Sequence, residues 1–244
     1  MEERILEVEH LSKFFGGVKA VNDVSFHLCK GEILGLIGPN GSGKSTTVNL
    51  INGTYAPNSG DIRFEGRSIL KYSIGQRFHL GISRTFQTPK PFTGLSVFDS
   101  VYTVALQMYS YAQSRKKAQE VLDMMDLISM ADMPCQKLPI EKRKWLDMAR
   151  ILVASPKVLM LDEVMAGLNP SEIDASIAMV KKINESGVTI IFIEHVMKAV
   201  SQLSHRIVVL NEGRFLCEGD VHTVLNDERV VKAYLGEEYA HAGN

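Results

Sequence analysis

The sequence predicts an α/β fold with a mixed, largely parallel sheet core, an antiparallel β part and an inserted helical subdomain. Short apolar runs alternate with turns over residues 4–37, helical spacing replaces strand patterns over 88–154, and strands alternate with helices after Pro156. Alternating strands and helices are typical of parallel sheets with right-handed crossovers. We therefore expect a single domain over residues 1–244, with an α/β core formed by residues 1–87 and 155–244 and a helical subdomain at 88–154.

The first part of the core is predicted to contain mostly β-strands. The stretch "ILEVEHLSKFFGGVKAVNDVSFHL" has the pattern of antiparallel strands, and it leads to one strongly apolar strand at residues 32–37. A helix is expected from Ser45 to about Asn52, where Gly53 ends it. The stretch "NSGDIRFEGRSI" then predicts a pair of strands joined at a glycine turn.

The middle of the chain is predicted to be helical. In "SRKKAQEVLDMMDLISMA" the residues Ala118, Val121, Leu122, Met125 and Leu127 recur near one face of a helix. After Pro156 we expect strand "KVLMLDE", helix "SEIDASIAMVKKINES", strand "VTIIFIEH", helix "VMKAVSQLS" and strand "RIVVLNEG". The last residues, "EEYAHAGN", are expected to be a frayed tail.

Composition indicates an ordinary globular protein. Of the 244 residues, 45% are apolar and 23% are charged, and the net charge is −1. The chain therefore has no excess of basic residues, so we expect no nucleic-acid partner. The three cysteines have no metal-ligand spacing and indicate buried thiols in a reducing compartment. The charged start is unlike a signal peptide, and the apolar runs are too short to cross a bilayer. We therefore expect a cytoplasmic protein, or one attached to a membrane through a partner.

The stretch "GPNGSGKST" at residues 38–46 matches the phosphate-loop pattern G-x-x-x-x-G-K-[ST] between a predicted strand and a predicted helix. Backbone N–H groups of such a loop surround phosphate oxygens, and the helix N-terminus adds partial positive charge. Lys44 would reach the β- and γ-phosphates, and the Ser45 hydroxyl would ligate Mg²⁺. The alternative is a glycine-rich turn that matches by chance. We predict that the chain binds a nucleoside triphosphate.

Two adjacent carboxylates, Asp162 and Glu163, end the apolar strand "VLMLDEV". At a strand end beside a phosphate loop, Asp162 would hold Mg²⁺ through water, and Glu163 would polarise an attacking water molecule. The alternative is a pair of solvated acids at the end of a strand.

Two further polar residues could complete the site. His195 ends the next strand, "IIFIEH", and would reach the γ-phosphate, although a histidine at a strand end is more often structural. Gln87, in "SRTFQTPKPF", would give an amide oxygen to Mg²⁺ or water, although any exposed glutamine would look the same.

The order of these motifs resembles the ATP-binding subunit of an ABC transporter over nearly the whole chain. Within that superfamily the chain is most similar to the branched-chain amino-acid, or hydrophobic amino-acid and amide, uptake group. The stretches that carry the resemblance are "FGGVKAVNDVSF", "GISRTFQTPKPFTGLSVFDSV", "LDEVMAGLNPSE", "IEHVMKAVSQLSHRIVVLNEGR" and "VVKAYLG". The resemblance implies a P-loop NTPase fold of the ABC type.

The resemblance also implies residue roles. Phe15 would stack on adenine, although it could equally be a core or turn aromatic. Gln87 would sense Mg²⁺ and the membrane partner, residues 166–169 would form a loop crossing a dimer interface, and His195 would be the switch histidine. The implied nucleotide-binding residues are Phe15, Gly38, Pro39, Asn40, Gly41, Ser42, Gly43, Lys44, Ser45 and Thr46; the catalytic residues are Glu163, His195 and Gln87; and the Mg²⁺ ligands are Ser45, Gln87 and Asp162.

The family's signature loop, L-S-G-G-Q, contacts the ATP of the opposite subunit in a head-to-tail dimer. In this chain it corresponds to Leu138-Pro139-Ile140-Glu141-Lys142, so proline replaces serine and glutamate replaces the second glycine. Proline suits the first turn of a helix but brings no hydroxyl to a phosphate. Glu141 favours the helix dipole but opposes an incoming triphosphate, and Lys142, Arg143 and Lys144 would offset its charge. The alternative is a solvated start of a surface helix.

We therefore expect an ATP-hydrolysing subunit, with ATP and Mg²⁺ as cofactors, that powers import of branched-chain amino acids or related amides. The implied partners are a second ATP-binding subunit, in a homo- or heterodimer, two transmembrane permeases and a solute-binding protein. The segment after Gln87 would grip a permease helix through Pro91, Phe92 and Leu95 at the cytoplasmic face of the membrane, unless those side chains pack only within the chain. The alternatives are a soluble ABC ATPase acting on ribosomes or DNA and a non-hydrolysing regulatory subunit.

Overall fold

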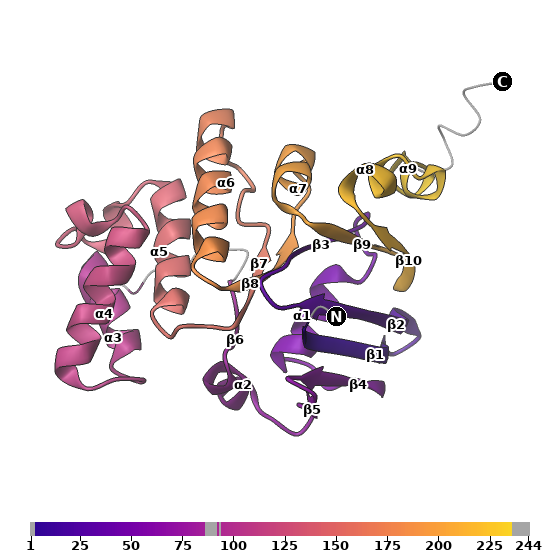
Figure 1. The fold of residues 1–244 in the computed structure, drawn as a ribbon, viewed down its shortest axis with the longest axis horizontal. Coiled ribbons are helices and arrows are strands. Elements are labelled where there is room, and N and C mark those ends of the chain that lie inside the picture. Colours follow the sequence, from indigo (N-terminus) through magenta and orange to yellow (C-terminus); the bar gives the residue numbers. More distant parts are fainter. Residues whose placement is uncertain (1–2, 86–91, 93, 236–244) are drawn as a thin grey trace.

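Two sheets and a lateral group of helices make up the fold in the computed structural model (Figure 1). The structure describes residues 3–85, 92 and 94–235. One sheet has four strands in the order β2-β1-β4-β5, and the other has six in the order β10-β9-β3-β8-β7-β6. The predicted α/β class, with a parallel core, an antiparallel part and inserted helices, is confirmed.

The four-stranded sheet is antiparallel and comes entirely from the first third of the chain. Its strands are β1 (Arg4–Phe15), β2 (Val18–Cys29), β4 (Ser59–Phe64) and β5 (Arg67–Ser68). β1 pairs with both β2 and β4, and Gly16 turns the chain between β1 and β2 with a positive φ of 57°. This arrangement agrees with the antiparallel pattern predicted from the sequence.

The six-stranded sheet is parallel except for its last strand. It consists of β3 (Ile33–Ile37), β6 (Ile82–Arg84), β7 (Val158–Asp162), β8 (Thr189–Ile193), β9 (Arg206–Asn211) and β10 (Arg214–Gly219). β3 lies between β8 and β9 and is parallel to both, whereas β10 pairs antiparallel with β9. The carboxyl ends of β3, β7 and β8 therefore lie at one edge of the sheet.

Alternate residues of the parallel strands enter two different cores. In β7, Leu159 and Leu161 pack into the core that contains the helical part, while Val158 and Met160 pack into the core shared with the antiparallel sheet. Because both faces are covered, all five residues of β7 are buried. This double burial explains why the strand is a continuous apolar run rather than an alternating one.

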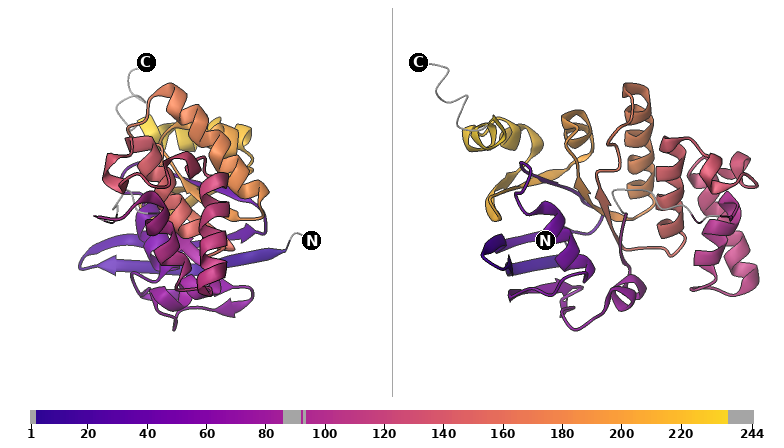
Figure 2. Two further views of the ribbon diagram at one scale, coloured as in Figure 1. Left: turned by 90° about the vertical axis from the view of Figure 1, so that its left-hand side faces the viewer. Right: turned by 180° about the vertical axis from the view of Figure 1, so that it is seen from behind.

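The helices cover both faces of the parallel sheet and extend to one side of it. Figure 1 shows α6 and α7 on one face and α1 with the antiparallel sheet on the other, and the rotated views of Figure 2 agree. The helices outside the lateral group are α1 (Lys44–Asn52), α2 (Ile74–Leu80), α6 (Pro170–Glu185), α7 (Met197–Leu203), α8 (Val221–Leu225) and α9 (Glu228–Leu235). None of the helices in the described ranges is both long enough and apolar enough to span a bilayer.

The lateral helical group lies between β6 and β7 in the sequence. It contains α3 (Val97–Ala105), α4 (Tyr111–Met124), two 3₁₀ turns η1 (Ile128–Met130) and η2 (Cys135–Lys137), and α5 (Ile140–Leu152). The predicted helix extended beyond Met124, but α4 ends there and Asp126 takes a positive φ of 52°. Met125 and Leu127 are nevertheless buried, so the apolar pattern reports the core even where the helix has ended.

Candidate functional site

A glycine-rich loop joins the central strand β3 to helix α1. Gly43 precedes the helix in a left-handed conformation with φ 99°, and Gly53 ends it in another with φ 86°. Gly38 has φ 149°, and a Cβ atom there would lie 2.0 Å from the carbonyl oxygen of Leu210. No side chain other than hydrogen fits that space, so this loop conformation requires glycine at position 38. The predicted strand, loop and helix are all present.

A hollow of about 540 Å³ opens over this loop. It is lined by residues of the loop and by side chains from other strand ends, namely Val18, Lys19, Ala20, Asn40, Gly41, Ser42, Gly43, Lys44, Ser45, Thr46, Glu163, His195 and Glu212. Among the predicted residues, those from Asn40 to Thr46, Glu163 and His195 therefore lie around one hollow. Val18, Lys19, Ala20 and Glu212 were not predicted, and nothing in their local pattern distinguishes them from ordinary turn and strand residues.

The Lys44 ammonium is folded onto the base of the loop. Its Nζ donates hydrogen bonds to the carbonyl oxygens of Gly38 at 2.7 Å and Pro39 at 2.9 Å. Burial lowers the pKa of Lys44, and the charges of Glu163 and Asp162 oppose that shift. Lys44 Nζ also donates to Ser42 Oγ at 3.4 Å, so these three hydrogen bonds of the buried cation all go to neutral loop oxygens. Such a cation is well placed to exchange these oxygens for phosphate oxygens, which carry full charge.

Asp162 is buried at the end of β7 and is paired with an arginine from the neighbouring strand. Arg84 Nη2 lies 3.2 Å from Asp162 Oδ2, and the Asp162 N–H donates to Thr85 Oγ1 at 3.1 Å. Burial raises the pKa of Asp162, while Arg84 and, more weakly, Lys44 and His195 counteract the rise. Arg84 and Thr85 were not predicted as part of the site, because their contact with Asp162 depends on the pairing of β6 with β7.

Glu163 leaves the line of β7 in an uncommon conformation. Its φ is +52°, and its N–H donates to the carbonyl oxygen of Ile193 at 2.9 Å. A positive φ is rare for a residue other than glycine and often marks a functional turn. The turn directs the carboxylate toward His195, whose Nε2 lies 3.0 Å from Glu163 Oε1. The two predicted catalytic groups therefore contact each other directly.

A third carboxylate, Glu194, directly precedes His195 in the sequence and was not predicted. It is 1% exposed, and Oε1 accepts a hydrogen bond from the Met165 N–H at 2.7 Å. Loss of hydration raises the pKa of Glu194 to about 7, although the Met165 and His195 N–H groups and Lys144 favour its charged form. Its position next to His195 in "IEH" was the only sequence signal for it.

The stretch before and within α5 differs in detail from its prediction. Pro139 is the residue just before the helix rather than part of its first turn, and Glu141 lies in that turn. The three cations expected to offset Glu141 each have another contact. Lys142 Nζ lies 3.4 Å from the centre of the Trp145 ring, Arg143 donates to the carbonyls of Leu138 and Gln136, and the buried Lys144 donates to the Ala166 carbonyl.

Phe15, the predicted adenine contact, lies apart from the hollow, and Gln87, the predicted Mg²⁺ ligand, lies outside the described residues. Phe15 is 43% exposed at the end of β1, with its ring edge-on to Tyr55 at a centroid distance of 5.1 Å. It is not among the described residues that line the hollow. Gln87 and Pro91 lie outside the described residues. Phe92 is described, and Arg150 of α5 lies 3.9 Å from the centre of its ring, so this aromatic contacts the chain's own helix.

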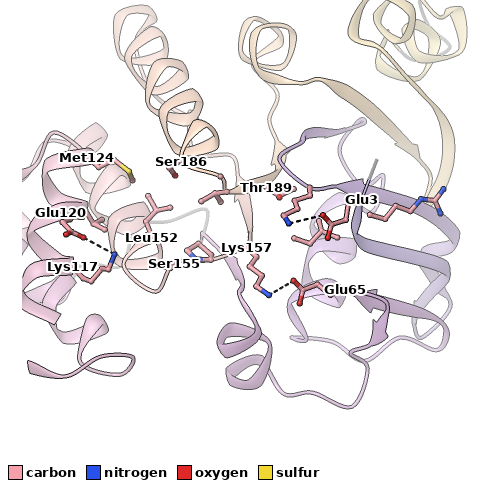
Figure 3. Close-up of a pocket in the computed structure, with 17 residues that line it drawn as sticks. Glu3, Glu65, Lys117, Glu120, Met124, Leu152, Ser155, Lys157, Ser186 and Thr189 are labelled. Atoms are coloured by element: carbon pink, nitrogen blue, oxygen red, sulfur yellow. Dashed lines mark hydrogen bonds and ion pairs between the residues drawn. The ribbon is translucent and has the colours of Figure 1, made fainter. Parts of the chain in front are cut away.

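A larger pocket, of about 770 Å³, lies at the opposite end of the parallel strands (Figure 3). Pro156 and Lys157 before β7, and Gly187 and Val188 before β8, contribute to its lining. Figure 3 shows Lys117 paired with Glu120 and Lys157 with Glu65 on its walls. Ligands of open parallel sheets bind at the carboxyl ends of the strands, so we take the hollow above the glycine loop as the candidate functional site.

Two family profiles match the chain. The ABC transporter profile matches residues 21–166, and a profile described as branched-chain amino acid ATP-binding cassette transporter matches residues 216–240. The second match begins within β10 and extends past α9.

Curated relatives are similar over nearly the whole length. The chain is 34% identical to the high-affinity branched-chain amino acid transport ATP-binding protein BraF of Pseudomonas aeruginosa, covering 97% of this chain and 100% of that protein. It is 36% identical to the protein LivG of Salmonella typhimurium, which has the same description, over 97% of this chain and 100% of LivG.

Solved structures are equally similar in fold. A nucleotide-free ATP-binding cassette from an ABC transporter superposes with a TM-score of 0.87 and 30% identity, over 96% of this chain and 100% of that one. The ADP conformation of an ATP-binding cassette gives a TM-score of 0.88 at 30% identity, over 96% of this chain and 99% of that one.

Proposed function

The chain belongs to the ABC transporter family of ATPases, and we propose that it is the ATP-hydrolysing subunit that drives uptake of branched-chain amino acids or related amides. The observation that carries this proposal is the single hollow lined by the glycine-rich loop, Glu163 and His195. In this arrangement phosphate-binding and water-activating groups come from three strand ends of one sheet edge.

The phosphate loop supplies the binding part of the proposed site. Residues 38–46 would surround the phosphates with backbone N–H groups, and Lys44 would exchange its loop carbonyls for β- and γ-phosphate oxygens. Ser45 and Asp162 offer a hydroxyl and a carboxylate, which are the hard oxygen ligands that Mg²⁺ prefers. With Gln87 they would hold a Mg²⁺ ion, which supplies positive charge to the phosphates.

Glu163 and His195 supply the proposed hydrolytic part. Glu163 would accept a proton from the attacking water molecule while the water oxygen bonds to the γ-phosphorus. The bond between the γ-phosphorus and the bridging oxygen, which leaves with ADP, would break. His195, at 3.0 Å from Glu163, would orient that carboxylate and donate toward the γ-phosphate. Phe15 would contact the adenine, as the family resemblance implies; its exposed ring beside Tyr55 is free of the main core.

Transport requires partners. We propose that two such ATP-binding subunits close over two ATP molecules, in a homo- or heterodimer, at the cytoplasmic face of the membrane. Residues 166–169 would lie at the subunit interface. Two permease subunits would receive the motion through the helical part and the segment after Gln87, and a solute-binding protein would deliver the solute.

The altered start of α5 favours one second candidate, a regulatory subunit that binds ATP without hydrolysing it. Pro139 brings no hydroxyl to the interface, and Glu141 adds negative charge where a triphosphate would approach. Hydrolysis by the purified chain, lost in Glu163→Gln, would reject this candidate. Binding without any hydrolysis, alone and with its copurified partners, would support it.

Affinity purification of the tagged protein from native membranes in mild detergent, with mass spectrometry, tests the transport proposal. We expect two polytopic permeases and, for a heterodimer, a second ATP-binding protein, none of which should appear with the tag alone. A Lys44→Ala variant, which we expect to fold but to bind ATP weakly, would show whether the assembly depends on nucleotide. Recovery of ribosomal proteins, or of nothing specific, would overturn the transporter assignment in favour of a soluble ATPase.

A further inference from the structure

A tyrosine near the end of the described chain contacts the base of the phosphate loop. Tyr234 lies in α9, and its hydroxyl oxygen accepts a hydrogen bond from the Gly38 N–H at 2.7 Å. The two residues are nearly two hundred positions apart in the sequence. The contact therefore links the last described helix to the first residue of the loop.

Gly38 is the most restricted residue of that loop. It is buried, its φ is +149°, and a Cβ atom would lie 2.0 Å from the Leu210 carbonyl oxygen and 2.6 Å from Ser42 Oγ. Its own carbonyl oxygen accepts the 2.7 Å hydrogen bond from Lys44 Nζ. Gly38 thus contacts Tyr234 through its N–H and Lys44 through its carbonyl oxygen. A shift of the Gly38 N–H therefore also displaces the carbonyl that holds Lys44.

Helix α9, which carries Tyr234, and the preceding helix α8 are fixed to the core. Val224 of α8 and Val230 of α9 are buried, and Tyr234 packs against the same hydrophobic cluster. The Asp220 side chain accepts a hydrogen bond from the Thr223 N–H and so caps α8. Burial raises the pKa of Tyr234, so its hydroxyl stays neutral at physiological pH and accepts the Gly38 hydrogen bond without carrying charge.

We propose that Tyr234 is a positioning residue for the nucleotide site: its hydroxyl holds Gly38, and through Gly38 the phosphate loop and Lys44, in the conformation that binds phosphates. The inference rests on the proposed function for the identity of the ligand. The proposal assigns α8 and α9 a role in nucleotide affinity, in addition to the roles of the loop motif and the strand-end residues.

The Tyr234→Phe variant tests this proposal because it removes one oxygen atom and keeps the partly buried ring. The Gly38 N–H would then be buried without a partner, and the loop would move to hydrate it. We expect the Kd for ATP and the KM for ATP to rise by roughly threefold to tenfold, with kcat nearly unchanged. Backbone amide exchange at residues 38–45, measured without nucleotide, should become faster.

A matched control is Tyr109→Phe, which also loses one hydroxyl contact, to Ser155 Oγ at 3.2 Å, but in the helical part of the molecule. It should leave the Kd, the KM and exchange in the loop unchanged. A purely structural role for Tyr234 would lower the melting temperature without changing the Kd or the KM of the folded protein.

Two results would overturn the proposal: an unchanged Kd for ATP in Tyr234→Phe, or unchanged exchange at residues 38–45. Failure of the proposed function would appear differently, in the wild-type protein itself, as an absence of ATP binding or as binding without hydrolysis. The exchange comparison needs no nucleotide, so it tests the Tyr234 contact in either case.

Discussion

Nε2 of His195 lies 3.0 Å from Oε1 of Glu163, so the residues that follow β8 and β7 form one contact across the sheet edge. The contact depends on two features: the parallel pairing of Asp162 with Ile193, and the positive φ of Glu163. A carboxylate oriented by an imidazole is a suitable general base, because its position is fixed before the substrate arrives.

Replacement of Glu163 by glutamine should stop hydrolysis while leaving ATP binding intact. The amide keeps the size of the side chain and a contact to His195 but cannot accept a proton from water. We expect kcat to fall by roughly 100-fold or more, with a Kd for ATP within about threefold of the wild-type value. Glu185→Gln, at the exposed end of α6, is the control and should hydrolyse ATP normally. Undiminished turnover in Glu163→Gln would remove this residue from the mechanism.

The stability of the protein should decrease as pH rises through the range in which Glu194 ionises. Burial raises the pKa of Glu194 to about 7, above its value in the unfolded chain, so the folded protein binds the extra proton between these values. The free energy of unfolding should therefore fall between roughly pH 5 and pH 7 and level off above that range, by an amount on the order of 3 kcal/mol.

Urea unfolding at several pH values checks this expectation. Glu194→Gln should flatten the pH dependence, because the amide keeps a carbonyl acceptor for the Met165 N–H but does not ionise. Lys144 and Glu163 also act on this carboxylate, so both should be intact in the comparison. A slope as steep in Glu194→Gln as in the wild type would assign the effect to another group.

Removal of the Arg84 guanidinium should destabilise the fold much more than removal of a surface arginine. Arg84 pairs with Asp162 at 3.2 Å and both side chains are largely buried, so Arg84→Met would leave a buried carboxylate without that partner. We expect a loss of about 3 kcal/mol in the free energy of unfolding. The control is Arg63→Met, since Arg63 pairs with Glu9 and Asp61 at the surface and should contribute less than about 1 kcal/mol. Equal, small losses measured by denaturant titration would contradict this.

Neutralising Glu141 should affect dimerisation and stability in opposite directions. In the first turn of α5 its carboxylate favours the helix dipole, so Glu141→Gln should cost about 0.3 to 1 kcal/mol of stability. If α5 faces the triphosphate of a second subunit, the same change removes a repulsion. We then expect ATP-dependent dimerisation of a Glu163→Gln background to become several-fold tighter, as measured by analytical ultracentrifugation.

Glu228→Gln, in the first turn of α9, is the matched control for Glu141. It should lose a similar helix-dipole interaction without a change in dimerisation. If Glu141→Gln left dimerisation unchanged or weakened it, the start of α5 would be an ordinary solvated helix end.

The strand-end residues of the site could be predicted from sequence because each lies next to a local signal. The glycine loop follows an apolar strand, and Asp162, Glu163 and His195 directly end two others, so parallel pairing brings them to one edge. The contacts of Arg84 with Asp162, and of Tyr234 with Gly38, could not be predicted in this way. Each depends on how distant elements pack, and neither residue has a distinguishing neighbour in the sequence.

The same distinction applies to the fold. Long amphipathic or apolar segments such as α6, β7 and β8 were predictable, whereas the three-residue strand β6 was not, because its pairing with β7 is the only feature that makes it a strand. The end of α4 was also missed, because the buried residues continue past Met124 while the backbone turns at Asp126. Apolar periodicity indicates which residues are buried. It indicates where a helix ends only if the buried residues end at the same position as the helix.

The central position of β3 has a consequence for how the chain assembles during synthesis. Ile33 pairs with Ile190 and Leu34 with Arg206, so both neighbours of this early strand belong to the last quarter of the chain. As the nascent chain leaves the ribosome, β1, β2 and β4 can pair at once. Both edges of β3 stay unpaired until β8 and β9 have been synthesised. Premature termination before β8 would therefore leave the most apolar early strand exposed, and such fragments should aggregate rather than retain a partial nucleotide site.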